Sequence, residues 1–169
     1  PHAALPHYRV TTDSNRTLNA GEVYLVDSGA QYQDGTTDIT RTLAIGEQSD
    51  ELKRAFTRVL KGMIAISRLR FPHGISGRDI DAFARAALWS AGQDYQHGTG
   101  HGVGHVLSVH EGPQNLSRRS TLPFEAGMIL SNEPGFYREG HFGIRTENLW
   151  ILLDPPAHPD RLSSDLHAC

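Results

Sequence analysis

The stretch GEVYLVDSGAQYQDGTTDITRTLAI, residues 21–45, decides the fold class. Its two halves, 22–27 and 38–45, alternate or run in apolar, β-branched and aromatic residues, and Asp34-Gly35 between them is a hairpin signal. The stretch therefore predicts two antiparallel strands, with Asp27 and Asp38 on the same face. A turn at Asp34-Gly35 leaves these aspartates about four residues out of register, so we expect a bulge or a wider loop to bring them together.

Two helices are predicted after this hairpin. Ser49 can cap the first, and Phe71-Pro72 is expected to end it. Ser76 and Asp79 resemble a capping box for the second, which Gly92 is placed to end. The apolar positions at helical spacing are Leu52, Phe56, Val59, Leu60, Met63 and Ile64 in the first helix, and Ile80, Phe83, Ala84, Ala87 and Leu88 on the buried face of the second.

Further strands are predicted at 128–133 and 143–152, which gives an α+β domain with helices packed on one side of a curved, mainly antiparallel sheet. A loop folding about Gly140 places Glu133 opposite Glu147, about 5 Å apart at Cβ. Two like charges at that distance are unfavourable unless a cation lies between them. The pairing therefore points to a metal site.

Composition sets the outer limits on function. The 169 residues are 38% hydrophobic with a formal net charge of −3 and without a Lys/Arg run, so neither nucleic acid nor a membrane surface is an expected partner. No apolar run approaches the roughly 20 residues of a membrane span. The single cysteine, Cys169, cannot form an internal disulfide, and a cytoplasmic location is the default expectation.

The two ends of the chain suggest a piece of a longer protein. The sequence starts at Pro1 rather than methionine, and Asp-Pro-Pro-Ala-His-Pro-Asp precedes a polar tail. We expect a partial catalytic domain over 1–153 and a loose, Pro-rich C-terminal extension over 154–169.

A histidine-rich and glycine-rich segment lies between the second helix and the later strands. Gly98, Gly100, Gly102 and Gly104 make a helix improbable there, at about 1 kcal/mol of lost propensity each. In an extended segment His97, His101 and His105 would lie on one side and point to a common site.

Five potential metal ligands are spread over the chain: Asp27, Asp38, His101, Glu133 and Glu147. Each alone has an ordinary structural explanation, such as a hydrogen-bonded strand aspartate or a surface ion pair. Together, four carboxylates and one imidazole would neutralise two divalent ions with mainly oxygen ligands, which suits manganese, cobalt or zinc. A dinuclear hydrolase is the leading interpretation.

The motifs that contain these residues resemble those of the pita-bread metallopeptidases, and among them the Xaa-Pro aminopeptidases of the large cytosolic type. The resemblance covers His7 to Leu152. It is carried by Asn-Arg-Thr-Leu, Tyr-Leu-Val-Asp-Ser-Gly-Ala-Gln-Tyr, Asp-Gly-Thr-Thr-Asp-Ile-Thr-Arg-Thr, His-Gly-Thr-Gly-His-Gly-Val-Gly and Val-His-Glu-Gly-Pro. It implies a pita-bread fold that is truncated at its N-terminus.

The resemblance also implies residue roles. The metal ligands, usually of two manganese ions with zinc or cobalt as alternatives, would be Asp27, Asp38, His101, Glu133 and Glu147. Asp38 and Glu147 would bridge both ions, and Glu133 would also accept and pass on a proton. His7, His97 and His110 match histidines that act on the substrate, whereas His105 matches no position with a role. Arg145 is expected to orient the carboxylate of Glu147.

The implied reaction is hydrolysis of the N-terminal Xaa-Pro bond of a peptide with proline second, by a protein whose full-length form can be a homodimer. Prolidase, which cuts only Xaa-Pro dipeptides, shares the ligand set and remains an alternative. The nine-residue step from His101 to His110 fits the large aminopeptidases better. A non-catalytic binding module on the same fold is a second alternative, and methionine aminopeptidase fits the local motifs poorly.

Overall fold

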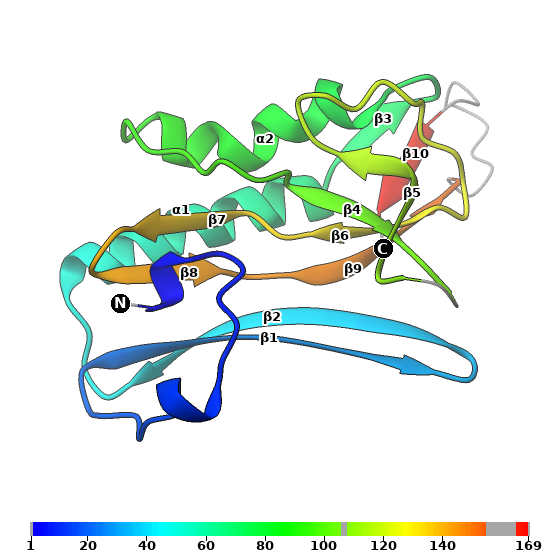
Figure 1. Ribbon diagram of the computed structural model, residues 1–169. Coiled ribbons are helices and arrows are strands. Elements are labelled where there is room, and N and C mark those ends of the chain that lie inside the picture. Colours follow the sequence, from blue (N-terminus) through cyan, green and yellow to red (C-terminus); the bar gives the residue numbers. More distant parts are fainter. Residues whose placement is uncertain (1, 106–107, 155–164, 169) are drawn as a thin grey trace.

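The computed structural model describes residues 2–105 and 108–154 and the backbone of 165–168. Within these ranges two α-helices accompany ten strands (Figure 1). The helices are α1 (Asp50–Ser67) and α2 (Gly77–Trp89), with short 3-10 turns η1 (His2–Ala4) and η2 (Thr12–Ser14) before them. The strands are β1 (Glu22–Tyr32), β2 (Gly35–Ile45), β3 (Arg70–Pro72), β4 (Gly100–Val103), β5 (His110–Leu116), β6 (Ile129–Asn132), β7 (Gly135–Arg138), β8 (Phe142–Arg145), β9 (Asn148–Leu153) and β10 (Asp165–Ala168).

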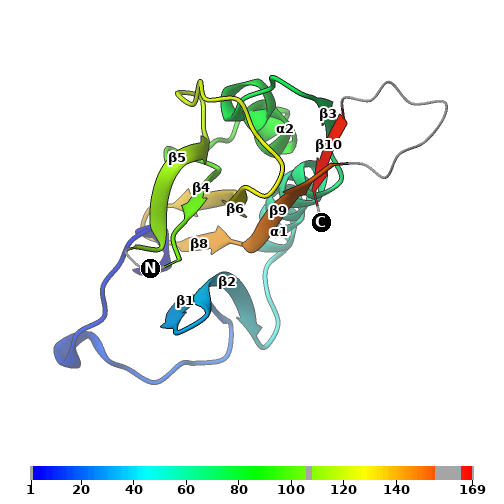
Figure 2. The same ribbon diagram turned by 90° about the vertical axis from the view of Figure 1, so that its right-hand side faces the viewer.

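The strands form one larger sheet and two hairpins. The six-stranded sheet has the order β3-β10-β9-β6-β4-β5, while β1-β2 and β7-β8 pair separately. Every described pair is antiparallel, which confirms the α+β prediction. Figures 1 and 2 show α1 and α2 together on one side of β6 and β9, with the β1-β2 hairpin on the other side. The site residues lie between the hairpin and the larger sheet.

The predicted bulge between the two aspartates is wrong. The β1-β2 register is continuous from Glu22↔Ile45 to Tyr32↔Gly35, with Asp27 opposite Thr40 and Gly29 opposite Asp38. The turn therefore lies one residue earlier than the Asp34-Gly35 signal suggests. This shift reduces the offset between the aspartates to two residues on one face, a diagonal cross-strand relation that needs no distortion.

The pairing predicted for the two glutamates agrees with the register. In β7-β8 Gly135 pairs with Arg145, and in β6-β9 Asn132 pairs with Asn148. Glu133 and Glu147 lie between these two ladders at matching positions, although they are not themselves members of a ladder pair. The predicted strand 143–152 is divided here into β8 and β9, and β7 was not predicted.

Both helices begin where the capping signals place them. The Ser49 side chain accepts from the Leu52 amide, and the Ser76–Asp79 capping box is formed. The first helix ends at Ser67, before the predicted Phe71-Pro72, because 70–72 form β3. No helix in the described ranges is long and apolar enough to cross a membrane.

Two residues that were assigned to the apolar faces of the helices are exposed in the structure. Ile64 and Phe83 are 44% and 48% exposed, whereas Leu52, Ile80 and Leu88 are buried as expected. The helices meet at small residues instead: a Cβ on Gly62 would lie 2.0 Å from the Ala84 carbonyl oxygen. This close approach turns the α1–α2 contact toward Gly62 and Ala84 and leaves Ile64 and Phe83 at the rim.

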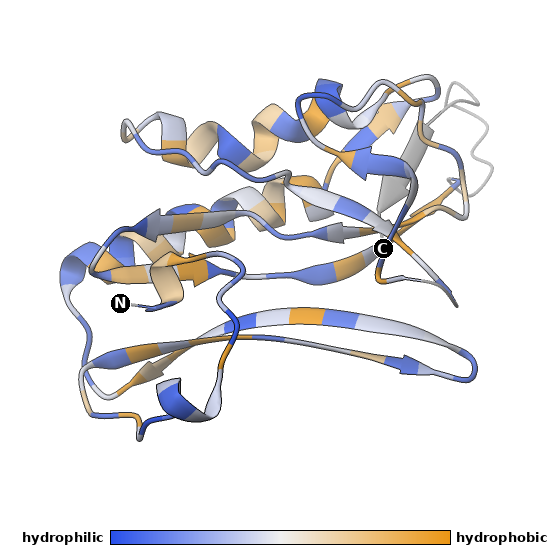
Figure 3. Cartoon of the chain, in the orientation of Figure 1, coloured by the Kyte–Doolittle hydropathy of each residue, from blue (hydrophilic) through white to orange (hydrophobic). Residues whose placement is uncertain are grey.

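The buried apolar side chains form two clusters. Figure 3 shows hydrophobic and hydrophilic residues alternating along both helices. One cluster is formed by Ile66, Phe71, Ile80, Ala84, Leu116, Phe124, Leu130, Trp150 and Leu152. The other is formed by Leu52, Ala55, Val59, Leu88, Tyr95, Phe142 and Ile144. These clusters hold α1 and α2 against β6–β9 and so fix the strands that carry the site.

The described part of the predicted C-terminal extension is not loose. Asp165–Ala168 form β10, which pairs with Phe71 and Arg70 of β3 and with Leu152 and Leu153 of β9. Backbone hydrogen bonding to two strands explains the order of this segment, which its composition does not reveal. The domain division at 153/154 itself stays a prediction, and residues 155–164 and 169 lie outside the described residues.

Candidate metal and peptide-binding site

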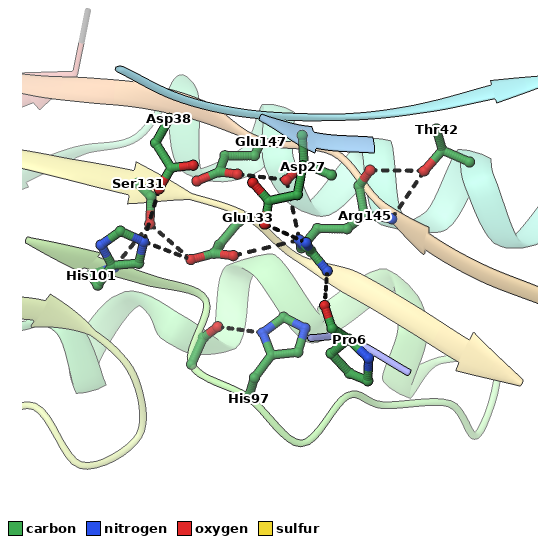
Figure 4. Close-up of polar contacts among 12 residues, drawn as sticks. Pro6, Asp27, Asp38, Thr42, His97, His101, Ser131, Glu133, Arg145 and Glu147 are labelled. Atoms are coloured by element: carbon green, nitrogen blue, oxygen red, sulfur yellow. Dashed lines mark hydrogen bonds and ion pairs between the residues drawn. The ribbon is translucent and has the colours of Figure 1, made fainter. Parts of the chain in front are cut away.

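The five predicted ligands come from four separate parts of the chain and meet between the β1-β2 hairpin and the β4–β9 strands (Figure 4). Asp27 and Asp38 lie on β1 and β2, and His101 lies on β4. Glu133 follows β6, and Glu147 precedes β9. One ligand atom each of Asp38, His101 and Glu147 lies within 4.8 Å of the other two, a separation that one bound ion can span.

His101 directs one ring nitrogen at the acids. Its Nδ1 lies 2.9 Å from the Gly102 carbonyl oxygen, which can only accept, so Nδ1 carries a proton. Its Nε2 lies 3.4 Å from Asp38 Oδ2 and 3.2 Å from Glu133 Oε1. Burial lowers the pKa of this imidazole, but hydrogen bonds to Asp38 and Glu133 outweigh burial and raise the pKa to about 10. A proton on Nε2 thus occupies the place that a cation could take.

Glu147 is the most enclosed of the acids. It is 1% exposed, and Oε2 accepts a 2.7 Å hydrogen bond from Thr40 Oγ1. Its Oε1 is buried without a hydrogen-bond partner. Burial, followed by repulsion from Glu133, raises the pKa of Glu147 to about 8. A carboxylate in this position needs either a proton or a cation.

Glu133 is held from two sides. The Ser131 hydroxyl donates to its Oε1 at 3.0 Å, and the same hydroxyl accepts from the His101 amide at 3.0 Å. Arg145 Nε lies 3.7 Å from Glu133 Oε2. The carboxylate is therefore oriented without being fully neutralised.

Arg145, the last residue of β8, connects the segments that carry the glutamates to the β1-β2 hairpin. Its Nη2 donates to Asp27 Oδ2 at 2.8 Å, and Nη1 donates to the Tyr137 hydroxyl and to the Pro6 carbonyl. The predicted role was to orient Glu147. The ion pairs of the guanidinium are instead with Asp27 and Glu133, and it is connected to Glu147 through Thr40, which accepts from Arg145 Nε at 3.3 Å and donates to Glu147 Oε2. Burial lowers the pKa of Arg145, but its charged and hydroxyl partners raise it above the usual value, so the residue is a fixed cation.

His97 lies beside this group with both ring nitrogens engaged. Nδ1 lies 2.7 Å from the Gly98 carbonyl oxygen, and Nε2 lies 2.8 Å from the Tyr137 hydroxyl. Burial lowers the pKa of this imidazole. His97 is therefore neutral near pH 7, with Nδ1 protonated and Nε2 accepting from Tyr137.

A cavity of about 810 Å³ opens in front of these residues. It is lined by Asp27, Asp38, His97, His101 and Glu133 together with His7, His110 and backbone and side chains of the β1-β2 hairpin. The rings of His101 and His110 meet edge to face with centroids 4.1 Å apart. His97, His101 and His105 were predicted to point to a common site. The prediction is wrong for His105, which does not line the cavity. The β4-β5 register shift between His101 and Val103 breaks the alternation.

Three residues that touch the site were not predicted: Thr40, Ser131 and Tyr137. Thr40 and Ser131 each stand two positions from a predicted ligand, Asp38 and Glu133, and strand periodicity places such neighbours on the same face. That periodicity could have identified them. Tyr137 contacts His97 because β7 pairs with β8, and no local sequence pattern indicates that contact.

The donor set fits a pair of divalent cations. The buried Oε1 of Glu147 lacks a hydrogen-bond partner among the described residues, and ligand atoms of Asp38, His101 and Glu147 lie within 4.8 Å of one another. Arg145 pairs with Asp27 and Glu133, so its charge does not compensate Glu147 directly. Oxygen ligands with a single imidazole are the set that hard or borderline divalent ions prefer.

Comparison with known proteins places the chain in a family. The model of metallopeptidase family M24 matches residues 1–153, so the chain belongs to that family. It is 55% identical to a probable Xaa-Pro aminopeptidase P of Laccaria bicolor, over 91% of this chain and 24% of the relative. It is 52% identical to Xaa-Pro aminopeptidase 1 of Dictyostelium discoideum, over 89% of this chain and 24% of the relative. The chain thus spans about a quarter of the length of these relatives.

Solved structures agree on the fold. The crystal structure of X-prolyl aminopeptidase from Caenorhabditis elegans, described as a cytosolic enzyme with a di-nuclear active site, superposes with a TM-score of 0.93 at 44% identity. That match covers 99% of this chain and 28% of the other. Recombinant prolidase from Thermococcus sibiricus gives 0.79 at 34% identity, over 90% of this chain and 40% of the other. The predicted pita-bread fold is confirmed.

Proposed function

We propose that this chain carries most of the active site of a metal-dependent Xaa-Pro aminopeptidase, which removes the first residue from peptides with proline second. The observation that carries the proposal is the meeting of Asp38, His101 and Glu147 within 4.8 Å beside a cavity of about 810 Å³. The similarity to aminopeptidases over about nine-tenths of the chain supports the substrate class.

The residues that would hold two metal ions are Asp27, Asp38, His101, Glu133 and Glu147. Manganese is the proposed metal, with zinc or cobalt as alternatives. Two such cations would polarise the scissile carbonyl and lower the pKa of a water molecule that they share. Asp27 also lines the cavity, and Arg145 donates to its Oδ2 at 2.8 Å.

The proton steps are assigned to this chain's own residues. Glu133 would take the proton of the attacking water and deliver it to the proline nitrogen as the C–N bond breaks. Ser131 orients that carboxylate through its 3.0 Å hydrogen bond. The second Glu133 oxygen lies 3.7 Å from Arg145 Nε.

The histidines are assigned to the substrate. His97 would stabilise the developing oxyanion by donating from Nε2, which requires that Nε2 take up a proton, because Nδ1 already donates to Gly98, and that the substrate replace the Tyr137 hydroxyl. His110, exposed beside His101, would contact the carbonyl of the following residue. His7 lines the same cavity and would form part of the substrate pocket. A cytoplasmic location and a homodimer of the full-length protein complete the proposal.

The alternative of a prolidase differs only in substrate length. A folded, manganese-loaded protein is expected to cleave an Xaa-Pro-Yaa tripeptide faster than the matching Xaa-Pro dipeptide. A preference for the dipeptide would favour prolidase. If both peptides stayed intact with two ions bound, both enzymatic functions would be contradicted in favour of a binding module.

Metal binding is tested directly by calorimetric titration of the metal-stripped protein with manganese. About two ions per chain are expected for the unmodified sequence, and fewer for Asp38→Asn. Titration of Asp34→Asn, at the exposed hairpin turn, supplies the matched control because that aspartate lies outside the ligand set.

A further inference from the structure

A second charged cluster, outside the proposed ligands, lies behind the segment that carries His97. Arg85 and Asp81 stand on α2, and both are nearly inaccessible, at 2% and 1% exposed. Arg85 Nε donates to Asp81 Oδ2 at 2.6 Å and Nη2 donates to Asp81 Oδ1 at 3.2 Å. This is a bidentate ion pair one helical turn apart on a buried helix face.

The remaining donors of Arg85 point to the backbone before β4. Nη1 donates to the Tyr95 carbonyl at 2.7 Å and to Asp94 Oδ1 at 2.9 Å, and Nη2 donates to the His97 carbonyl at 2.9 Å. The guanidinium carbon also lies 3.8 Å from the centroid of the Tyr95 ring. All five N–H groups of Arg85 are therefore used, two of them on main-chain oxygens within three residues of each other.

Asp81 extends the cluster to the other end of the same segment. Thr99 Oγ1 donates to Asp81 Oδ1 at 2.6 Å, and the Thr99 and Tyr95 hydroxyls lie 2.5 Å apart. Thr99 is fully buried, and its carbonyl accepts from the Glu133 amide at 2.7 Å. One buried cluster thus holds the backbone of His97 on one side and the backbone of Glu133 on the other.

An ion pair of this kind is a weak source of stability, because desolvation of both charges offsets their attraction. Its geometric effect is larger, since a planar guanidinium with five directed donors fixes the groups that accept from it. Lysine at the same place would keep the charge but could not reach both carbonyls and the carboxylate together.

We propose that Arg85, with Asp81 and Thr99, is a positioning unit that sets the 95–99 segment and thereby the places of the His97 ring and the Glu133 carboxylate. The inference deepens the proposed function and rests on it for the catalytic meaning of those two residues. Arg85 itself does not line the cavity, and its hydrogen bonds to Tyr95 and His97 are to main-chain carbonyls, so it acts on the cavity-lining His97 through backbone.

The test compares Arg85→Lys and Thr99→Val with Arg78→Lys, a control at the exposed start of the same helix. The first readout is NMR of the metal-free protein, which follows the His97 ring nitrogens and the Glu133 amide. Both signals are expected to move in Arg85→Lys and Thr99→Val and to stay in place in Arg78→Lys. Thr99→Val changes no charge, so it keeps the test valid if Arg85→Lys folds poorly.

The second readout is steady-state kinetics of the manganese-loaded protein on an Xaa-Pro-Yaa peptide. Displacement of catalytic groups is expected to lower kcat by about 10- to 100-fold with little change in KM. Unmoved His97 and Glu133 signals with unchanged kcat, or a lowered Tm as the sole effect, would overturn the proposal. If the unmodified protein leaves the peptide uncut, the proposed function fails, while the NMR comparison still decides whether the unit positions these residues.

Discussion

Two acids of this site, Asp27 and Glu147, lie in different environments. Asp27, on the β1-β2 hairpin, has a side chain that is 45% exposed and is paired with Arg145 at 2.8 Å. Glu147, between β8 and β9, is 1% exposed, and one of its oxygens has no partner. The exposed acid has found a counter-charge within the protein, and the buried one has not. A bound cation is therefore required mainly to compensate the buried carboxylate of Glu147.

The largest effect that follows from this difference is expected for Glu147→Gln. Loss of this carboxylate should remove at least one of the two manganese ions and lower kcat/KM by more than about 100-fold, since even outer residues of metal sites cost 10- to 100-fold. The same change should stabilise the metal-stripped protein at pH 7 by about 1 kcal/mol or more, because Glu147, with its pKa raised to about 8, must take up a proton when the chain folds and glutamine need not.

Calorimetry with manganese and thermal unfolding of the metal-stripped form check both halves of this prediction. Glu139→Gln, at the exposed turn between β7 and β8, is the matched control and should change neither measurement. Full metal binding by Glu147→Gln would contradict the proposed difference between Glu147 and Asp27.

Asp27→Asn is expected to have the next largest effect. The variant keeps the shape of the side chain but leaves Arg145 with less negative charge around it, and metal affinity should fall by about 10-fold. A titration with manganese measures the change, beside Asp34→Asn as control. A loss as large as that of Glu147→Gln would mean that exposure does not separate the two acids.

Thr40→Val tests the hydrogen bond that orients the buried acid, Glu147. The valine is similar in size but cannot donate the 2.7 Å hydrogen bond to Glu147 Oε2, so the carboxylate loses its orientation. We expect manganese affinity to fall by less than about 10-fold, at the lower end for outer residues of metal sites. Thr57→Val, on the exposed side of α1, should bind manganese like the unmodified chain, and equal losses in the two variants would contradict a specific role of Thr40.

The smallest effect concerns Asp94, an acid that keeps its charge without any metal. Burial raises its pKa, but hydrogen bonds, first from Arg85, outweigh this and lower the pKa to about 2. A lowered folded-state pKa contributes stability that is present above about pH 4 and is lost as pH falls through about 2. The contribution is about 1 kcal/mol after screening, because the Asp94 side chain is 28% exposed.

Urea unfolding of the unmodified protein and Asp94→Asn between pH 2 and 7 measures this contribution. The stability difference between them should be largest near neutral pH and shrink on acidification. A constant difference across that range would show that the Asp94 charge is not responsible.

Much of the fold was accessible from local pattern. The caps at Ser49 and Ser76 gave correct helix starts, because capping depends on a few neighbouring residues. The turn about Gly140 gave the correct register for Glu133 and Glu147, because a short hairpin fixes register over its whole length. The Asp34-Gly35 signal was one residue late, and that small error produced a bulge that does not exist.

Contacts between distant segments were not accessible in the same way. Arg145 was expected to orient Glu147, yet it binds Asp27 and Tyr137 directly and is connected to Glu147 through Thr40, because its partners are set by the strands that the fold brings near. Ile64 and Phe83 were assigned to apolar faces by period alone, and the close approach at Gly62 leaves them exposed.

The sequence by itself determined the residue types of the site, the hairpins that carry four of its acids, and the family to which the motifs point. These depend on side-chain chemistry and on alternation along single strands. Tertiary structure alone decided which acid is buried without a partner, which is paired with Arg145, and how the Arg85 cluster holds His97 and Glu133. Burial and charge pairing depend on how distant segments pack, as for Arg145 and Asp27, which are 118 residues apart. The local sequence of one segment does not determine that packing.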